Sequence, residues 1–183
     1  MTQRKGIILL MCAALAALPG CGFRPLYGGG RAGETAVDLS DVAIATIPER
    51  AGQMLRNELL DRMAPYGEAS DPHWLLQVSI VEQRLNYGIQ KDATSSRASL
   101  RADASFTLVE RGSGTTALSG SSLSINSFNV LRETYATAAA EADARQRAVR
   151  DLAEDITTRV AIFIVAARKK DPALAPRQPE RRP

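Results

Sequence analysis

The residue types that carry covalent or metal chemistry in proteins are scarce in this 183-residue chain. It has two cysteines, Cys12 and Cys21, and one histidine, His73. Enzymes that act on acyl or phosphoryl groups need a nucleophile with a base in reach, paired carboxylates or metal ligands. His73 follows Pro72 and precedes an apolar stretch, which is typical of a histidine at the start of a strand. The sequence therefore argues against an enzyme, a cofactor and a metal site.

Two other features could suggest chemistry, but each has a plainer interpretation. The glycines at 28–30 and around Gly112 lack the spacings of phosphate-binding loops. The acidic pairs Glu141/Asp143 and Glu154/Asp155 fall in a long helical pattern, where we expect them on the solvated face of the helix.

Cys21 stands where an apolar run ends and a glycine-rich run begins. A cationic start followed by apolar residues 6–18 is typical of a secretory signal, and this run is shorter than the roughly 20 residues of a membrane-spanning helix. Leu18-Pro19-Gly20-Cys21 resembles the bacterial lipobox, in which cleavage occurs before a diacylglyceryl-modified cysteine. We therefore expect residues 1–20 to be a lipoprotein signal peptide and Cys21 to carry a covalent lipid. The alternative is ordinary cleavage that leaves a free thiol.

The formal net charge of +3 does not describe the body of the protein. Residues 21–167 carry 15 basic and 18 acidic residues, whereas residues 168–183 carry six basic and two acidic residues. Proteins that bind nucleic acid concentrate lysine and arginine over the folded surface, so a nucleic-acid partner is not expected.

Gly22 directly follows Cys21, at the position where an aspartate would act as a retention signal in such lipoproteins. The absence of that aspartate indicates export to the outer membrane.

Apolar periodicity predicts a single α+β domain at residues 42–168. The expected elements are a strand at 42–47, an amphipathic helix at 49–64, strands at 74–89, 97–108 and 115–130, and a helix at 134–168 capped by Thr134. The order βαβββα predicts a two-layer sandwich, a four-stranded mixed or antiparallel sheet with two helices on one face. Residues 21–41 read as an acylated N-terminal tether and 169–183 as a disordered, basic, proline-rich tail.

The strand at 97–108 has the clearest alternation. Small and apolar residues predict one buried face, and Arg97 and Arg101 fall on the opposite, wet face. The register of the next strand stays open, because Leu123 and Ile125 favour one face and Phe128 favours the other.

The segment Cys21-Gly-Phe-Arg-Pro-Leu-Tyr-Gly28 is similar to the mature start of the LptE family, formerly named rare lipoprotein B. The similarity continues in the element order and in Ser127-Phe128-Asn129, which precedes an alanine-rich final helix. Only the first motif is specific. Pro19 in the lipobox and the long basic tail depart from the family pattern.

The resemblance implies a non-enzymatic outer-membrane lipoprotein. Members of that family plug the lumen of the LptD β-barrel from the periplasmic side and help it insert lipopolysaccharide into the outer leaflet. On this basis Lys91, Arg97 and Arg101 are candidate lipopolysaccharide-binding residues, because guanidinium groups suit phosphates. The alternative is that these cations only solvate the sheet. A different class, a pilotin or periplasmic chaperone for another barrel or a secretin, also fits a lipid-anchored α+β domain.

Overall fold

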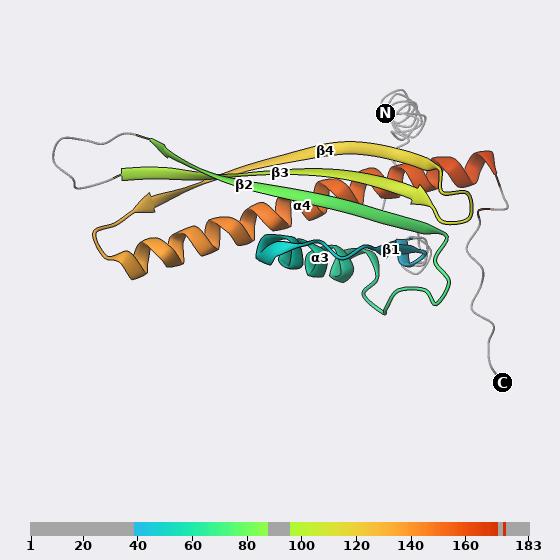
Figure 1. Cartoon of the computed structure of the whole chain (residues 1–183), viewed down its shortest axis with the longest axis horizontal. Coiled ribbons are helices and arrows are strands. Elements are labelled where there is room, and N and C mark those ends of the chain that lie inside the picture. The colour runs from blue at the N-terminus through green and yellow to red at the C-terminus, as the bar shows by residue number, and fades with distance from the viewer. Residues whose placement is uncertain (1–38, 88–95, 172–173, 175–183) are drawn as a thin grey trace, which may run out of the picture. The chain divides into compact units, whose positions relative to one another are not determined.

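The structure, a computed structural model, describes residues 39–87, 96–171 and 174 of the 183-residue chain. The chain divides into two units, Met1–Ala32 and Gly33–Pro183, and every described residue belongs to the second. Its elements are, in order, β1 (Val42–Ile44), α3 (Glu49–Met63), β2 (Trp74–Tyr87), β3 (Ser96–Glu110), β4 (Thr116–Val130) and α4 (Thr134–Lys170). The sheet forms one layer of this unit and the helices α3 and α4 form the other (Figure 1). The predicted α+β sandwich with βαβββα order is confirmed.

The sheet is open and has the order β1-β2-β3-β4. β1 pairs in parallel with Trp74–Leu76 at the start of β2, and α3 provides the crossover that a parallel connection requires. β2, β3 and β4 form a long antiparallel meander joined along nearly their whole lengths. A short turn after Glu110 connects β3 to β4, as the glycines around Ser113 predict.

The core lies between the sheet and the two helices. α3 buries Leu55, Leu59 and Met63, at the four-residue spacing seen in the sequence. α4 buries Leu152, Ile156 and Val160 in the same way. Burial of a side chain of this size contributes about 1.5–3 kcal/mol relative to leaving it in water, so these two stripes fix both helices on one face.

The structure settles the register of β4. Phe128 is buried at 6% exposure, whereas Leu123 and Ile125 are 50% and 53% exposed on the face away from the helices. The positions of β4 that face α4 carry Ser122 and Ser124, which pair with Ala104 and Ala102 of β3. The inner positions of both strands therefore carry small residues on the side of the sheet that faces α4. Because successive side chains of a strand point to opposite faces, Leu123 and Ile125 lie on the open face.

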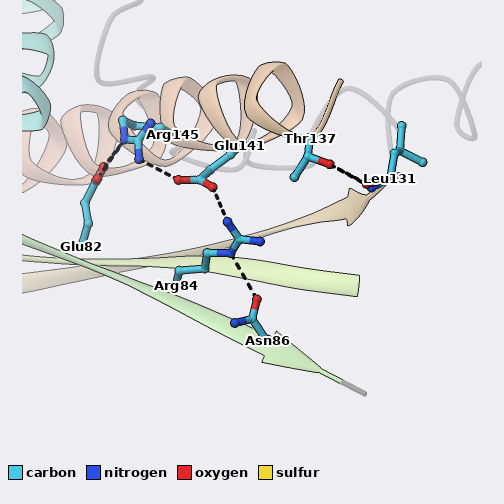
Figure 2. A network of polar contacts seen from close by, with 7 residues as sticks. All are labelled: Glu82, Arg84, Asn86, Leu131, Thr137, Glu141 and Arg145. Atoms are coloured by element: carbon cyan, nitrogen blue, oxygen red, sulfur yellow. Dashed lines mark hydrogen bonds and ion pairs between the residues drawn. The ribbon is translucent and has the colours of Figure 1, made fainter. Parts of the chain in front are cut away.

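The prediction that Thr134 caps α4 is wrong. The N-cap position is Glu133, and no side chain caps the helix there. Instead the Thr137 hydroxyl accepts a 2.9 Å hydrogen bond from the amide nitrogen of Leu131 and donates a 3.1 Å bond to the Leu131 carbonyl oxygen. This pair of bonds ties the end of β4 to the first turn of α4 (Figure 2).

Several predicted boundaries also shift. β1 ends at Ile44, three residues earlier than expected, although Ile47 is still buried at 1% exposure. α4 continues to Lys170, and its last turn carries three cations that complement the helix dipole. The predicted strand end at Ile89 lies outside the described residues, as does most of the predicted tail.

Candidate functional site

Of the four residues predicted to bind lipid or lipopolysaccharide, the structure describes Arg97 and Arg101. Both lie on β3 with the residues that face away from the helices. Four residues of extended strand separate them, which is about 13 Å of backbone. Cys21 and Lys91 lie outside the described residues.

Arg101 is held by an acidic neighbour on its own strand. Its Nε and Nη2 atoms donate to the two carboxylate oxygens of Asp103 at 2.8 and 2.9 Å, a bidentate ion pair. The hydrogen bond from Arg101 lowers the pKa of Asp103 below its usual value, and burial opposes this shift. The guanidinium is therefore oriented on the open face, but Asp103 already balances much of its charge.

Arg97 has a different environment at the far end of β3. Its side chain is exposed and stands opposite Asn129 of β4, which is also exposed. Arg97 forms no ion pair with any of the residues that the structure describes. Of the two arginines, Arg97 therefore carries the cation that a bound anion could neutralise.

The open face also carries apolar side chains that the sequence analysis did not assign to a site. Val81, Leu123 and Ile125 are 67%, 50% and 53% exposed. The strand register aligns Val81, Asp103 and Leu123 in one row across the sheet, and it aligns Gln83, Arg101 and Ile125 in the next. We name Val81, Leu123, Ile125 and the Arg101–Asp103 pair the open-face patch. Single exposed apolar residues are ordinary, but a cluster around an ion pair suits an amphiphilic ligand or partner.

Beside this patch the open face is hollowed into a shallow depression of about 520 Å³. Its lining includes the side chains of Gln77, Ser79, Ser105, Thr107, Ser119 and Ser121. Ser79 and Ser105 are hydrogen bonded to each other at 2.8 Å between their hydroxyl oxygens. Because the hydroxyl side chains on these three neighbouring strands are short, this part of the open face is recessed and polar.

On the opposite face a network of ion pairs attaches the first half of α4 to the end of β2 (Figure 2). Arg145 Nε lies 2.8 Å from Glu82 Oε2, and Arg145 Nη2 lies 3.2 Å from Glu141 Oε1. Glu141 also accepts a 2.8 Å bond from Arg84, and hydrogen bonding to Glu82 raises the pKa of Arg145. Arg84 in turn lies 5.4 Å from the centre of the Phe128 ring.

This network corrects an expectation about the acidic residues of α4. Glu141 does not sit on a solvated face but bridges β2 and α4. Asp143 and Glu154 are exposed as predicted. Asp143 and Asp155 pair with Arg147 and Arg159, each four residues along the helix. The packed residues between helix and sheet here are small, with Ala144 against Ala98, Leu100 and Phe128.

His73 contacts Glu110 and Trp74 at the start of β2. Its Nε2 atom lies 3.2 Å from a carboxylate oxygen of Glu110, and its ring packs edge-on against Trp74 with 4.9 Å between ring centres.

Within the described ranges, no group of three or more His, Cys, Asp or Glu side chains is placed to hold a metal ion. No helix in the part of the chain that the structure describes is long and apolar enough to cross a membrane.

An open sheet with two helices on one face is also the fold of solved structures described as bacterial lipoproteins. A protein from Caulobacter crescentus CB15, described as a lipoprotein, is 24% identical, with a TM-score of 0.60, and the match covers 74% of this chain and 98% of that one. A minor lipoprotein from Acinetobacter baumannii is 16% identical, with a TM-score of 0.55, and the match covers 67% and 92%. No curated protein matches the sequence.

A comparison of the sequence with models of protein families covers the same elements. The model of the lipopolysaccharide-assembly family LptE matches residues 35–160, which include all four strands, α3 and most of α4. The chain belongs to the LptE family of lipopolysaccharide-assembly proteins. This confirms the family that the segment at residues 21–28 and the element order predicted.

Proposed function

We propose that this lipopolysaccharide-assembly protein is an outer-membrane lipoprotein that plugs the lumen of the LptD β-barrel and takes part in the insertion of lipopolysaccharide into the outer leaflet. The observation that carries the proposal is the family match across residues 35–160. The family is not one of enzymes, and we propose no catalytic role.

The open face of the sheet is our candidate for the surface that meets the lipopolysaccharide. Lipid A combines phosphates with acyl chains, and this face combines cations with exposed apolar side chains. Arg97 would bind a phosphate directly, because charge-assisted hydrogen bonds from guanidinium to phosphate are strong and specific in geometry. Val81, Leu123 and Ile125 would contact acyl carbon atoms. Arg101 would contribute after Asp103 shares or releases it, and Lys91 would add a further cation.

The proposed anchor is an acylated Cys21, with residues 21–41 as the tether to the domain. Stable anchoring to a bilayer needs more than one acyl chain, because a single chain gives only marginal binding. A triacylated cysteine would satisfy this requirement and hold the domain on the periplasmic side, where the barrel lumen is accessible.

Depletion of the protein in cells tests the function directly. We expect the amount of lipopolysaccharide on the cell surface to fall while the protein LptD loses its assembled form. A tagged copy should also co-purify with LptD at a fixed ratio. If instead surface lipopolysaccharide stays normal and a secretin or another barrel co-purifies, the protein is a pilotin or chaperone and the proposal is wrong.

A second experiment tests the anchor. Mass spectrometry of the mature protein should find acyl chains on an N-terminal Cys21, and Cys21→Ser should release the protein from the outer membrane fraction. An unmodified N-terminus on membrane-bound protein would contradict the anchor and leave the lipopolysaccharide role to the first test.

A further inference from the structure

The two ends of the described domain meet at one corner of the sandwich. Arg168, in the last turn of α4, lies near Asp41, which directly precedes β1, with 3.9 Å between Nη2 and Oδ2. Asp41 also accepts a 3.0 Å bond from the amide nitrogen of His73 and a 3.2 Å bond from that of Trp74. The Phe163 ring of α4 packs edge-on against Trp74 with 5.7 Å between ring centres. The end of α4 is therefore fixed beside the point where the chain enters the sheet.

Arg168 also fixes where the chain leaves this corner. Its Nε atom donates a 2.7 Å hydrogen bond to the carbonyl oxygen of Leu174, and the Leu174 amide donates a 3.1 Å bond to the carbonyl oxygen of Asp171. The Arg168 side chain is 11% exposed, so these contacts are largely shielded from water. The residues after Leu174 therefore start from the same corner as the residues that precede Leu39.

The positive charge of the mature chain is concentrated at this corner. Residues 168–183 carry six basic and two acidic residues, whereas residues 21–167 carry 15 basic and 18 acidic residues. Asp41 pairs with Arg168, so the remaining five cations of the segment supply its excess charge. We name these five residues the basic end: Lys169, Lys170, Arg177, Arg181 and Arg182. The first two are exposed in the last turn of α4.

We propose that the basic end binds the anionic headgroups of the membrane leaflet that holds the acyl chains of Cys21. The inference rests on the proposed lipid anchor, because the anchor brings that leaflet within reach. Seventeen residues separate Cys21 from Leu39, and they can span at most about 60 Å. Arg182 follows Leu174 by eight residues and can lie at most about 28 Å from it. A leaflet within about 28 Å of the corner is therefore in reach of both segments.

The charge distribution then decides which part of the domain approaches the leaflet. Each lysine or arginine close to an anionic leaflet strengthens binding about fivefold, and the effect falls off within a Debye length of about 8 Å at physiological ionic strength. The body of the domain has a net negative charge and is repelled by the same surface. A triacylated Cys21 already suffices for stable anchoring, so the basic end would set the orientation of the domain. The end of α4 would face the bilayer, and the turn between β4 and α4 would point away from it.

Binding to vesicles tests the inference without the anchor. The probe is the mature chain, residues 21–183, with Cys21→Ser. We mix it with vesicles of phosphatidylglycerol and phosphatidylethanolamine in equal amounts, or with vesicles of neutral phosphatidylcholine. We expect binding to the anionic vesicles, little binding to the neutral ones, and a loss of binding as the salt concentration rises.

Two sets of substitutions separate the basic end from overall charge. Replacement of the three arginines of the basic end by glutamine should weaken binding to the anionic vesicles about tenfold or more. The matched control is Arg50→Gln, Arg132→Gln and Arg150→Gln together, which removes the same charge from exposed arginines elsewhere on the domain. It should change binding less than about twofold, because these residues lie outside the basic end.

A second measurement tests the orientation with the acylated chain inserted in the same anionic vesicles. A fluorophore is attached at Ala166→Cys or at Tyr135→Cys, two exposed positions on α4 that lie about 46 Å apart. Energy transfer to an acceptor on the lipid headgroups should be stronger from residue 166 than from residue 135. The three glutamine substitutions of the basic end should reduce this difference.

Several outcomes would overturn the proposal. These are equal binding to neutral and anionic vesicles, equal loss from the two sets of substitutions, or energy transfer that is equal at both positions or stronger at residue 135. Binding to isolated peptidoglycan but not to the anionic vesicles would also overturn it and assign the basic end to the cell wall. The vesicle probe carries no lipid and needs neither lipopolysaccharide nor LptD, so its outcome is independent of the proposed function.

Discussion

The hydroxyl of Ser124 donates a 2.7 Å hydrogen bond to the carboxylate of Asp151, and this bond joins the middle of β4 to α4. The side chain of Asn126 lies within reach of the same carboxylate oxygen at 3.2 Å and of the Ser124 hydroxyl at 2.9 Å. Ser124 is buried at 6% exposure, so Asp151 satisfies a polar group that water hardly reaches. In the middle of β4 the inner face carries Ser122 and Ser124 in place of apolar side chains, and polar contacts fix α4 to the strand there.

Removal of this carboxylate should destabilise the fold. We expect Asp151→Ala to lower the free energy of unfolding by about 1–3 kcal/mol, because it leaves the Ser124 hydroxyl buried without its acceptor. Chemical denaturation measures this change. The control is Glu154→Ala on the next turn of α4, an exposed residue whose loss should change stability by about 0.5 kcal/mol or less. Equal effects would show that the buried bond contributes nothing specific.

A methyl group at Gly120 should also be costly. A Cβ atom there would lie 2.8 Å from Cζ and 3.0 Å from Cε1 of the Phe106 ring, closer than carbon atoms pack. We expect Gly120→Ala to cost about 1–3 kcal/mol, as overpacking of a core does, and thermal denaturation should show the lower midpoint. Gly112→Ala, in the turn before β4, meets nothing within 4 Å and is the matched control. Unchanged stability in both variants would mean that the ring moves aside freely.

The Arg101–Asp103 pair predicts an acid titration. The pKa of Asp103 is lowered from 3.8 by its bond to Arg101, so the charged form is favoured in the folded state. The pair thus adds stability at pH values above about 4, and this contribution disappears as pH falls below 3.8 through the lowered pKa. NMR titration of the Asp103 carboxyl should give a midpoint below 3.8 that returns toward 3.8 in Arg101→Leu. A midpoint that does not move would show that Arg101 does not hold the carboxylate in solution.

The difference between the two arginines predicts an order of effects on ligand binding. We expect Arg97→Asp to weaken binding of lipopolysaccharide to the purified protein about tenfold, the loss of one charge-assisted bond of about 1.5 kcal/mol. Arg101→Asp should add a smaller effect, because Asp103 already neutralises that cation. Arg150→Asp, an exposed arginine on α4, is the control for net charge and should bind as the parent does. Equal weakening by all three would reduce the effect to overall charge and remove Arg97 and Arg101 from the site.

Asp103→Asn offers the reverse test of the same pair. It removes the charge that competes for Arg101, so binding of lipopolysaccharide should strengthen if Arg101 takes part. Titration calorimetry of this variant beside the parent measures the change. Weaker or equal binding would indicate that Arg101 only supports Asp103 and the strand.

The sequence predicted the fold class because each element carried its own periodicity. The buried stripe of α3 and the alternation of β3 depend on local spacing, and both faces came out as expected. β4 could not be assigned from its own residues, because the middle of its inner face is polar. Ser122 and Ser124 lie there beside Ala104 and Ala102 of β3, and the partner of Ser124 is Asp151 on α4, which no local pattern in β4 shows.

The candidate site was predictable in part for a similar reason. Alternation placed Arg97 and Arg101 on the open face, but it could not show that Asp103, two residues along, holds one of them. The bridge from Arg145 to Glu82 joins residues 63 positions apart, so no local pattern could reveal it. The Val81 and Leu123 cluster likewise exists only through the register of three strands.

α4 has 37 residues, and a helix of that length extends about 55 Å at 1.5 Å per residue. The hydrocarbon layer of a membrane is only about 30 Å thick. A barrel lumen that received this helix lengthwise would be too short to enclose it, so at least one end would project into the aqueous space. Labels at Tyr135 and at Lys169 would then differ in their access to water, and the labelled end that stays accessible would show how far the helix is inserted.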